Sequence, residues 1–250
     1  MSGTSFGIII PARYASTRFP GKPLEDLGGK TMIERVVEAA MMANPDAGVA
    51  VATDDVRIAE HIQSKCEVVM TSESHPSGTD RCAEALEKLG WDCDVVVNLQ
   101  GDEPFIKPEQ VALLVSAFKN PNIEIATLKI GIGEAEEIQN PNVVKVVCDG
   151  NDQALYFSRS PIPFDRNGQS LGSGIQYYRH IGMYAFRRDA LIKVSKLSPS
   201  ALEKTEMLEQ LRWLENGMGI GVKETTWASP AIDTREDLAK ALKFIWLSSD

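Results

Sequence analysis

The chain has 250 residues, a mass of 27.4 kDa and a formal net charge of −9 at pH 7. This acidic balance argues against a general affinity for nucleic acid or for anionic membrane surfaces. No apolar segment approaches the roughly 20 residues that cross a bilayer, and the N-terminus lacks the pattern of a secretory signal. We therefore expect a cytoplasmic protein without membrane insertion.

The first part of the chain alternates between apolar strands and helices. We predict strands at residues 7–11, 48–53, 67–70 and 94–99, and helices from a Thr31-x-x-Glu34 capping box and over residues 54–64 and 79–89. Strands that are apolar throughout and separated by helices are typical of a parallel sheet covered on both faces. Ligands of such sheets bind at the carboxyl ends of the strands.

The second part of the chain is less regular. We predict strands at residues 123–130, 143–148, 154–158 and 179–186, a surface loop at 167–174, and helices at 201–215 and 234–246. The sequence contains no internal repeat and no clear linker, so we expect residues 1–250 to form one α/β domain. The four cysteines, Cys66, Cys82, Cys93 and Cys148, show no C-x-x-C spacing, which favours reduced thiols over a metal or redox site.

The segment PARYASTRFPGKPL (residues 11–24) places cations directly after the first predicted strand. Guanidinium groups of Arg13 and Arg18 and the ammonium of Lys22 suit a phosphate chain. Small residues, including Ser16 and Gly21, would let backbone amides approach the same oxygens. The alternative is a solvated surface loop with incidental cations.

A nearby Gly-Lys-Thr sequence is not a P-loop. The pattern G-x-x-x-x-G-K-[ST] would need glycine where this chain has Leu24. We interpret Lys30 and Thr31 as a turn and a helix cap. No G-x-G-x-x-G follows the first strand, so a nicotinamide cofactor is not expected.

Two acidic residues are candidate magnesium ligands. Asp102, in the loop Gln-Gly-Asp-Glu-Pro, follows the most apolar strand, where one carboxylate with phosphate oxygens and water could hold Mg²⁺. Asp233 is the second candidate. A lone Asp-Glu pair in a turn is more often structural, and a helix cap alone explains Asp233.

A small-residue turn precedes the helix predicted at 79–89. Residues 77–81 (Ser-Gly-Thr-Asp-Arg) could contact a base or ribose, whereas the structural alternative is helix capping by Thr79. His180 lies in a predicted strand and is of interest for binding, although a lone histidine is more often structural. We interpret His61 and His75 as surface or cap residues.

Taken in order, these stretches resemble the 3-deoxy-manno-octulosonate (KDO) cytidylyltransferases, also called CMP-KDO synthetases. The segments run from residue 8 to residue 238 and read IIIPARYASTRFPGKPL, VATDD, SGTDR, VVNLQGDEP, NPNVVKVV, ALYFSRSPIPFDR, RHIGMY, EMLEQLR and AIDTREDL. Each is a modest signal alone, whereas the ordered series covers nearly the whole chain.

The resemblance implies a Rossmann-like nucleotidyltransferase fold, with a mostly parallel sheet, helices on both faces, and sugar-binding and dimer elements within residues 140–215. It implies a Mg²⁺-dependent homodimer that converts CTP and KDO into CMP-KDO and pyrophosphate for lipopolysaccharide biosynthesis. Carried over by motif, the triphosphate ligands are Arg13, Ser16, Arg18 and Lys22; the base and ribose ligands are Ser77, Gly78, Thr79 and Arg81; the metal ligands are Asp102 and Asp233; and the sugar-acid ligands are Gln100, Arg159, His180, Tyr184, Glu209 and Gln210. Gln100 is expected to contact the nucleotide as well, and Lys22, Arg13, Arg18 and the two aspartates are the expected catalytic residues.

The sequence leaves alternatives open for the identity of the sugar substrate and for the type of reaction. Ala231 and Lys204 depart from the family pattern near the inferred sugar side, so an amino-substituted KDO or a sialic-type acid is the first alternative substrate. A glycosyltransferase and a nucleotide-binding module without catalysis are further alternatives. The Glu-Pro that follows Asp102, in place of Asp-x-Asp, speaks against the former.

Overall fold

The computed structural model describes residues 4–15, 19–44, 48–166, 175–228, 232 and 234–247. Of Lys240 and residues 243–247 it describes the backbone alone. The chain divides into two compact units, which we describe separately. Unit 1 comprises residues 1–112 and 229–250, and unit 2 comprises residues 113–228. The C-terminal segment thus returns to the unit that contains the N-terminus. The expectation of one domain remains a prediction.

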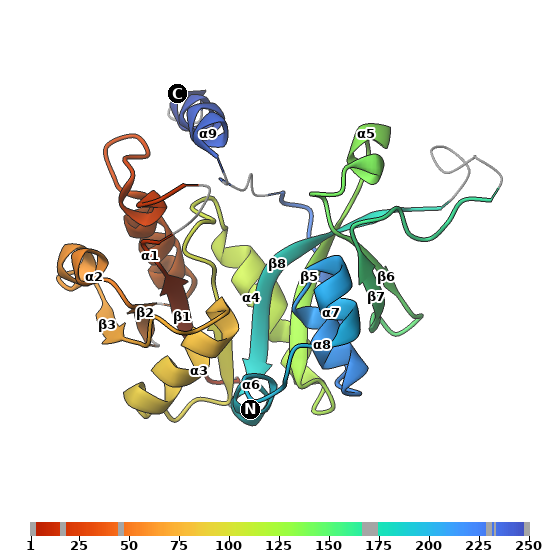
Figure 1. Cartoon of the computed structure of the whole chain (residues 1–250), viewed down its shortest axis with the longest axis horizontal. Coiled ribbons are helices and arrows are strands. Elements are labelled where there is room, and N and C mark those ends of the chain that lie inside the picture. The colour runs from red at the N-terminus through yellow and green to blue at the C-terminus, as the bar shows by residue number, and fades with distance from the viewer. Residues whose placement is uncertain are drawn as a thin grey trace. The chain divides into compact units, whose positions relative to one another are not determined.

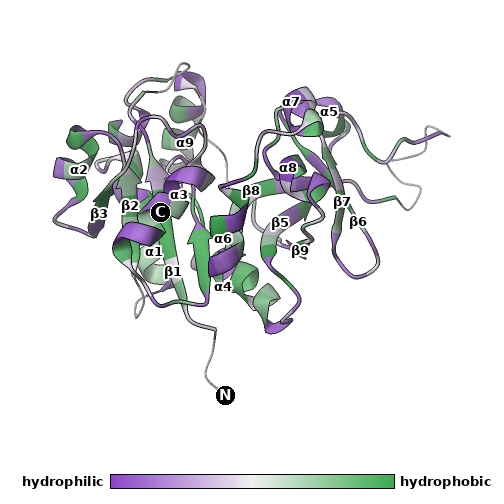
Figure 2. Cartoon of the chain, turned by 60° about the horizontal axis from the view of Figure 1, so that its bottom comes forward, coloured by the Kyte–Doolittle hydropathy of each residue, from purple (hydrophilic) through white to green (hydrophobic). Residues whose placement is uncertain are grey.

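Unit 1 contains a parallel sheet in the order β3-β2-β1-β4, of which Figure 1 labels β3, β2 and β1. Its strands are β1 (Phe6–Ala12), β2 (Val49–Thr53), β3 (Glu67–Met70) and β4 (Val95–Asn98). Ile8 in β1 is aligned with Val49 on one side and Val97 on the other. β1, β2 and β4 are almost entirely buried and mostly hydrophobic, and Figure 2 shows the hydrophobic character of β1. The predicted parallel sheet is confirmed here.

Helices connect these strands as the sequence predicts. They are α1 (Met32–Ala43), α2 (Val56–Ile62) and α3 (Gly78–Leu89), and the C-terminal α9 (Arg235–Leu247) also belongs to this unit. The Thr31–Glu34 capping box begins α1 and satisfies two backbone N–H groups. A short 3-10 helix, η1 (Lys22–Leu24), follows Gly21, whose φ of 74° favours glycine.

Unit 2 contains a mixed sheet. Its strands are β5 (Ile125–Gly131), β6 (Lys145–Cys148), β7 (Ala154–Ser158), β8 (Tyr178–Arg187) and β9 (Ile220–Glu224). β5 lies between β8 and β9 and is antiparallel to β8 and parallel to β9. β6 pairs in antiparallel fashion with β7 and with β8. The predicted strands of this region are confirmed, whereas β9 was not predicted.

The helix predicted at residues 201–215 is wrong in one respect, because it is broken. The structure has α7 (Ala201–Glu206) and α8 (Gln210–Glu215). Met207 between them adopts a left-handed conformation with φ of 54°, which ends the first helix. The remaining helices, none of them predicted, are α4 (Pro108–Ser116), η2 (Ala117–Lys119), α5 (Ala135–Gln139) and α6 (Arg188–Val194).

Three further sequence expectations concern the whole chain. All four cysteines are free thiols, as expected. Within the described ranges, no helix combines the length and the apolar character that crossing a bilayer requires. The loop predicted at residues 167–174 lies outside the described residues.

Candidate active site

A cavity lies in unit 1, where the loops after β1 and β4 and the start of α3 meet. Because carboxyl ends of parallel strands share one edge of a sheet, this is the edge at which a ligand is expected. The residues that line it are Pro11, Ala12, Arg13, Lys22, Pro23, His75, Pro76, Ser77, Gly78, Arg81, Gln100, Gly101 and Asp102. The structure therefore brings together most of the predicted nucleotide-binding residues and the predicted metal ligand Asp102.

Lys22 connects three distant segments at this cavity. Its ammonium lies 2.7 Å from Asp102 Oδ2 and donates a second hydrogen bond of 2.7 Å to the carbonyl oxygen of Ile232. Ile232 is buried in an apolar cluster with Phe19 and Leu27. The Lys22 side chain is nearly buried, whereas that of Asp102 is 41% exposed. The carboxylate of Asp102 is therefore held in place and still accessible from the cavity.

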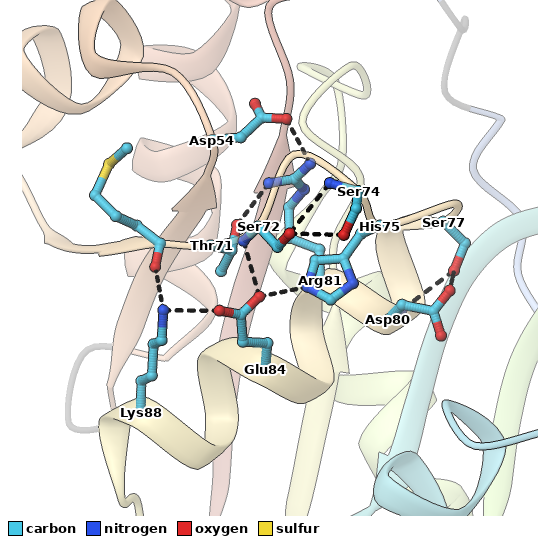
Figure 3. Close-up of polar contacts among 11 residues, drawn as sticks. Asp54, Thr71, Ser72, Ser74, His75, Ser77, Asp80, Arg81, Glu84 and Lys88 are labelled. Carbon is cyan, nitrogen blue, oxygen red and sulfur yellow. Dashed lines mark hydrogen bonds and ion pairs between the residues drawn. The ribbon is translucent and has the colours of Figure 1, made fainter.

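Arg81 enters the cavity from α3 in a fixed orientation (Figure 3). Its side chain is almost fully buried. Nη2 donates to Asp54 Oδ2 at 2.8 Å, and Nη1 donates to Thr71 Oγ1 at 2.5 Å. Charge-assisted contacts of this kind fix a guanidinium before any ligand arrives.

His75 is a cavity residue that the sequence interpretation placed on the surface or in a cap. Figure 3 shows its ring against Glu84 of α3, which is bonded to Nε2. Glu84 also accepts hydrogen bonds from the backbone N–H of Ser72 and from Lys88. Burial alone would raise the pKa of Glu84, but the bonds from Lys88, Ser72 and His75 outweigh it and lower the pKa to about 2. The one available sequence signal was the position of His75 two residues before the Ser-Gly-Thr turn.

The start of α3 differs from the sequence interpretation in its capping residue. Ser77, not Thr79, is the N-cap, and its hydroxyl accepts a hydrogen bond from the backbone N–H of Asp80. Thr79 is buried and is not among the residues that line the cavity.

A Cβ at Gly101 would lie 2.9 Å from the Pro11 carbonyl oxygen. Only glycine permits this close approach of the β1 and β4 loops.

Gln100 is oriented by its neighbour in β4. Its Nε2 donates to Asn98 Oδ1 at 3.0 Å, and Asn98 is fully buried. Gln100 lines the unit 1 cavity. Its predicted contact with the sugar acid stays a prediction.

The other predicted sugar-acid residues lie in unit 2. The His180 and Tyr184 rings of β8 are neighbours, with centroids 5.3 Å apart, and Tyr184 packs edge-on against Trp213. Glu209 precedes α8, and Gln210 is its first residue and is buried. Burial and the charge of Glu209 raise the pKa of Tyr184 well above its ordinary value, so the phenol stays protonated.

Arg159 follows β7 and is anchored by backbone carbonyl groups. Its guanidinium donates to the carbonyl oxygens of Glu206, Pro141 and Met207 at 2.8, 3.0 and 3.3 Å. A guanidinium has five N–H donors, so these contacts orient the group and leave donors for a ligand. The contacts to residues 206 and 207 also hold the break between α7 and α8.

Three predicted site residues, Ser16, Arg18 and Asp233, lie outside the described residues. In the part of the chain that the structure describes, no group of three or more His, Cys, Asp or Glu side chains is arranged to hold a metal ion. A metal site at Asp102 would therefore have to combine this carboxylate with ligands from elsewhere. Substrate phosphate oxygens and water commonly complete Mg²⁺ sites in this way.

Comparison with known proteins agrees with this geometry. Residues 7–220 match the cytidylyltransferase family. The chain is 49% identical over 245 residues to 3-deoxy-manno-octulosonate cytidylyltransferase of Parabacteroides distasonis, covering 95% of this chain and 96% of the relative. It is 51% identical over 243 residues to the protein of that name from Bacteroides thetaiotaomicron, with 95% and 96% covered.

Solved structures give the same result. CMP:2-keto-3-deoxy-manno-octonic acid synthetase complexed with CTP superimposes with a TM-score of 0.91 at 42% identity, over 98% of this chain and 100% of that one. The fold, together with the match of residues 7–220 to the family, shows that this protein is a cytidylyltransferase with the α/β nucleotidyltransferase fold. Within that class, the chain belongs to the 3-deoxy-manno-octulosonate cytidylyltransferase family.

We predict that Glu84→Gln destabilises the protein by about 2 kcal/mol at pH 7, because Lys88 and the backbone N–H of Ser72 lose the charged carboxylate that they bind. The pKa of Glu84 is about 2 in the folded chain and 4.5 ordinarily, so its contribution is present above pH 4.5 and is lost as the pH falls toward 2. Denaturant unfolding of both proteins between pH 7 and pH 2.5 measures this. Glu87→Gln, an exposed position of the same helix, is the control and should change little. A difference that does not shrink on acidification would contradict the charge-based explanation.

Proposed function

We propose that this protein transfers CMP from CTP to the anomeric hydroxyl of KDO, giving CMP-KDO and pyrophosphate for lipopolysaccharide biosynthesis. The observation that carries the proposal is the unit 1 cavity, which joins Arg13, Lys22 and Asp102 to the start of α3. The near full-length similarity to 3-deoxy-manno-octulosonate cytidylyltransferases supports the same reaction. This family membership leaves no support for a glycosyltransferase.

In the proposed reaction the anomeric oxygen of KDO forms a bond to the α-phosphorus of CTP while the bond to the β-phosphate oxygen breaks. Negative charge shifts to the departing pyrophosphate, so catalysis depends on alignment and charge neutralisation. Arg13 and Lys22 are suited to the triphosphate, and we assign Ser16 and Arg18 of the same loop to it as well. Ser77, Gly78 and Arg81 are assigned to the base and ribose. Thr79 of the same turn is buried, so we do not assign it a direct contact with the nucleotide.

We propose Mg²⁺ as the cofactor, held by Asp102 and Asp233 together with phosphate oxygens. The oxygen donor and the accessibility of Asp102 fit this ion. Lys22 binds both Asp102 and the carbonyl of Ile232, the residue before Asp233, which supports a shared role for the two aspartates. When bound, the ion would offset the charge of the triphosphate.

The sugar acid is assigned to unit 2. Arg159 is suited to its carboxylate, because a guanidinium fork matches two carboxylate oxygens. His180, Tyr184, Glu209 and Gln210 are assigned to its hydroxyl groups, and Gln100 to both substrates. The free thiols agree with a reducing compartment, so we place the reaction in the cytoplasm.

The experiment that tests this function is pyrophosphate release from CTP, with Mg²⁺ and a panel of KDO, amino-substituted KDO and a sialic-type acid. We expect KDO to give the highest kcat/KM, because the relatives named for this substrate match nearly the whole chain. If activity with KDO were negligible and another acid were used rapidly, that other acid would be the substrate. Absence of turnover with every acid would favour a binding module.

We predict that Asp102→Asn lowers kcat on the order of 10²–10³-fold while the protein stays folded. A neutral amide cannot replace the carboxylate as a ligand of the proposed Mg²⁺ beside the phosphates. The coupled pyrophosphate assay measures the loss, and circular dichroism checks the fold. Asp92→Asn, an exposed aspartate elsewhere in unit 1, is the matched control. Near-normal turnover of Asp102→Asn would refute the assigned role.

We also propose a homodimer formed through unit 2. Large apolar side chains of this unit are exposed, namely Leu155 at 61%, Phe164 at 85% and Met207 at 75%. Exposed apolar side chains become typical of an interface where they gather in one patch, and we propose that these residues do so in the dimer.

We predict that the protein sediments at twice its chain mass of 27.4 kDa and that Phe164→Glu shifts it toward the monomer, because the charge would have to be buried in the interface. Val56→Glu, at an exposed apolar position of unit 1, is the control and should leave the mass unchanged. A monomeric wild-type protein at micromolar concentration would contradict the dimer.

A further inference from the structure

Thr127 of β5 lies at an irregularity between β5 and β8. Thr127 is aligned with Tyr184, but the next residue, Leu128, is aligned with Ile181, so Gly182 and Met183 bulge from β8. The Thr127 side chain is fully buried at this point. Its hydroxyl oxygen lies 3.1 Å from the carbonyl oxygen of Ile181 and 2.8 Å from that of Met183. The same oxygen lies 2.9 Å from Nε2 of His180.

The number of protons determines the direction of these contacts. A threonine hydroxyl has one hydrogen to donate, and carbonyl oxygens only accept. If the hydroxyl donated to His180, both carbonyl oxygens would face the bare hydroxyl oxygen at hydrogen-bond distance without a proton between them. The hydrogen therefore goes to a carbonyl group of the bulge, and Nε2 of His180 donates to Thr127. This arrangement requires that Nε2 carries the proton.

The other ring nitrogen of His180 is then an acceptor. Burial lowers the pKa of His180 to about 3, so the ring holds one proton at neutral pH. A neutral imidazole with its proton on Nε2 has a lone pair on Nδ1. Among the described residues, none is hydrogen-bonded to Nδ1.

Tyr184, the neighbour of His180, provides a second sign of a ligand. Tyr184 is only 7% exposed, and its hydroxyl forms no well-aligned hydrogen bond in the described part of the chain, although its interaction with Thr127 lowers the pKa somewhat against the effect of burial. A buried phenol without a partner is costly unless a ligand or water satisfies it. Its ring is the neighbour of His180. The two residues thus offer one donor and one acceptor, which a sugar hydroxyl matches because it both accepts and donates.

We propose that Thr127 is a positioning residue that fixes His180 as the Nε2–H tautomer, so that Nδ1 accepts a hydrogen bond from a hydroxyl group of the sugar acid. The inference rests on the proposed function for the identity of this ligand. A lone pair at Nδ1 repels a carboxylate, so His180 binds a hydroxyl group of the sugar acid and not its carboxylate. The tautomer itself follows from the contacts of Thr127 alone.

The first test is the tautomer of His180 in ¹⁵N-histidine-labelled protein without substrate. Two-bond ¹H–¹⁵N correlation spectra distinguish a protonated from an unprotonated ring nitrogen. The chain has three histidines, and His180→Asn assigns the signals by their absence. We expect a protonated Nε2 in the wild type and in Thr127→Ser, and a changed proton distribution in Thr127→Val, which keeps the shape but lacks the hydroxyl. A protonated Nδ1 in the wild type, or an unchanged spectrum in Thr127→Val, overturns the inference.

The second test compares the two substrates. We expect Thr127→Val to raise the KM for the sugar acid about tenfold and to leave the KM for CTP unchanged, while Thr127→Ser stays close to the wild type. A merely structural role would affect both KM values, and equal changes in both contradict the proposal. If Thr127→Val does not fold, the wild-type and Thr127→Ser spectra still decide the tautomer. A protonated Nε2 in a protein that turns over no sugar acid supports the tautomer and contradicts the proposed function alone.

Discussion

The contact on which the site depends is that of the Lys22 ammonium with Asp102 and with the carbonyl of Ile232. These partners are 80 and 210 residues away in the sequence. A nearly buried ammonium group is costly unless it is paired and hydrogen-bonded, so the contact favours one arrangement of the β1 loop, the β4 loop and the C-terminal segment. Those are the segments that carry the cations and the carboxylates of the proposed chemistry. Stability and function thus depend on the same ammonium group.

Several polar side chains of the two units are held in one orientation by neighbouring groups before a ligand is present. Arg81 is fixed by Asp54 and Thr71, and Arg159 by three backbone carbonyl groups. His75 is fixed by Glu84. Catalysis by alignment benefits from such preorganisation, because the groups need not be reordered when the reaction occurs.

The two units offer different chemistry. The unit 1 cavity contains cationic side chains that suit a triphosphate. In unit 2, His180 is neutral and Tyr184 stays protonated, so this pair offers hydrogen bonds without charge. Burial causes both states, since a low-dielectric environment disfavours the charged form of each group. The difference parallels the two proposed substrates, an anionic phosphate chain and a hydroxyl-rich sugar.

Local sequence patterns were enough to predict the parallel strands of unit 1, the cap of α1 and most of the segments that line the unit 1 cavity. Strand hydrophobicity and helix capping act over a few residues, so a short window of sequence suffices to predict them. The break at Met207 and the bulge at Thr127 became visible only in the folded chain, and the place of His75 at the cavity had no more than a weak signal in the sequence. The Met207 break interrupts an amphipathic pattern that continues through it, and contacts with Arg159 hold it. The bulge depends on a hydroxyl group 54 and 56 residues from the carbonyl groups it contacts, a separation over which no local pattern carries information.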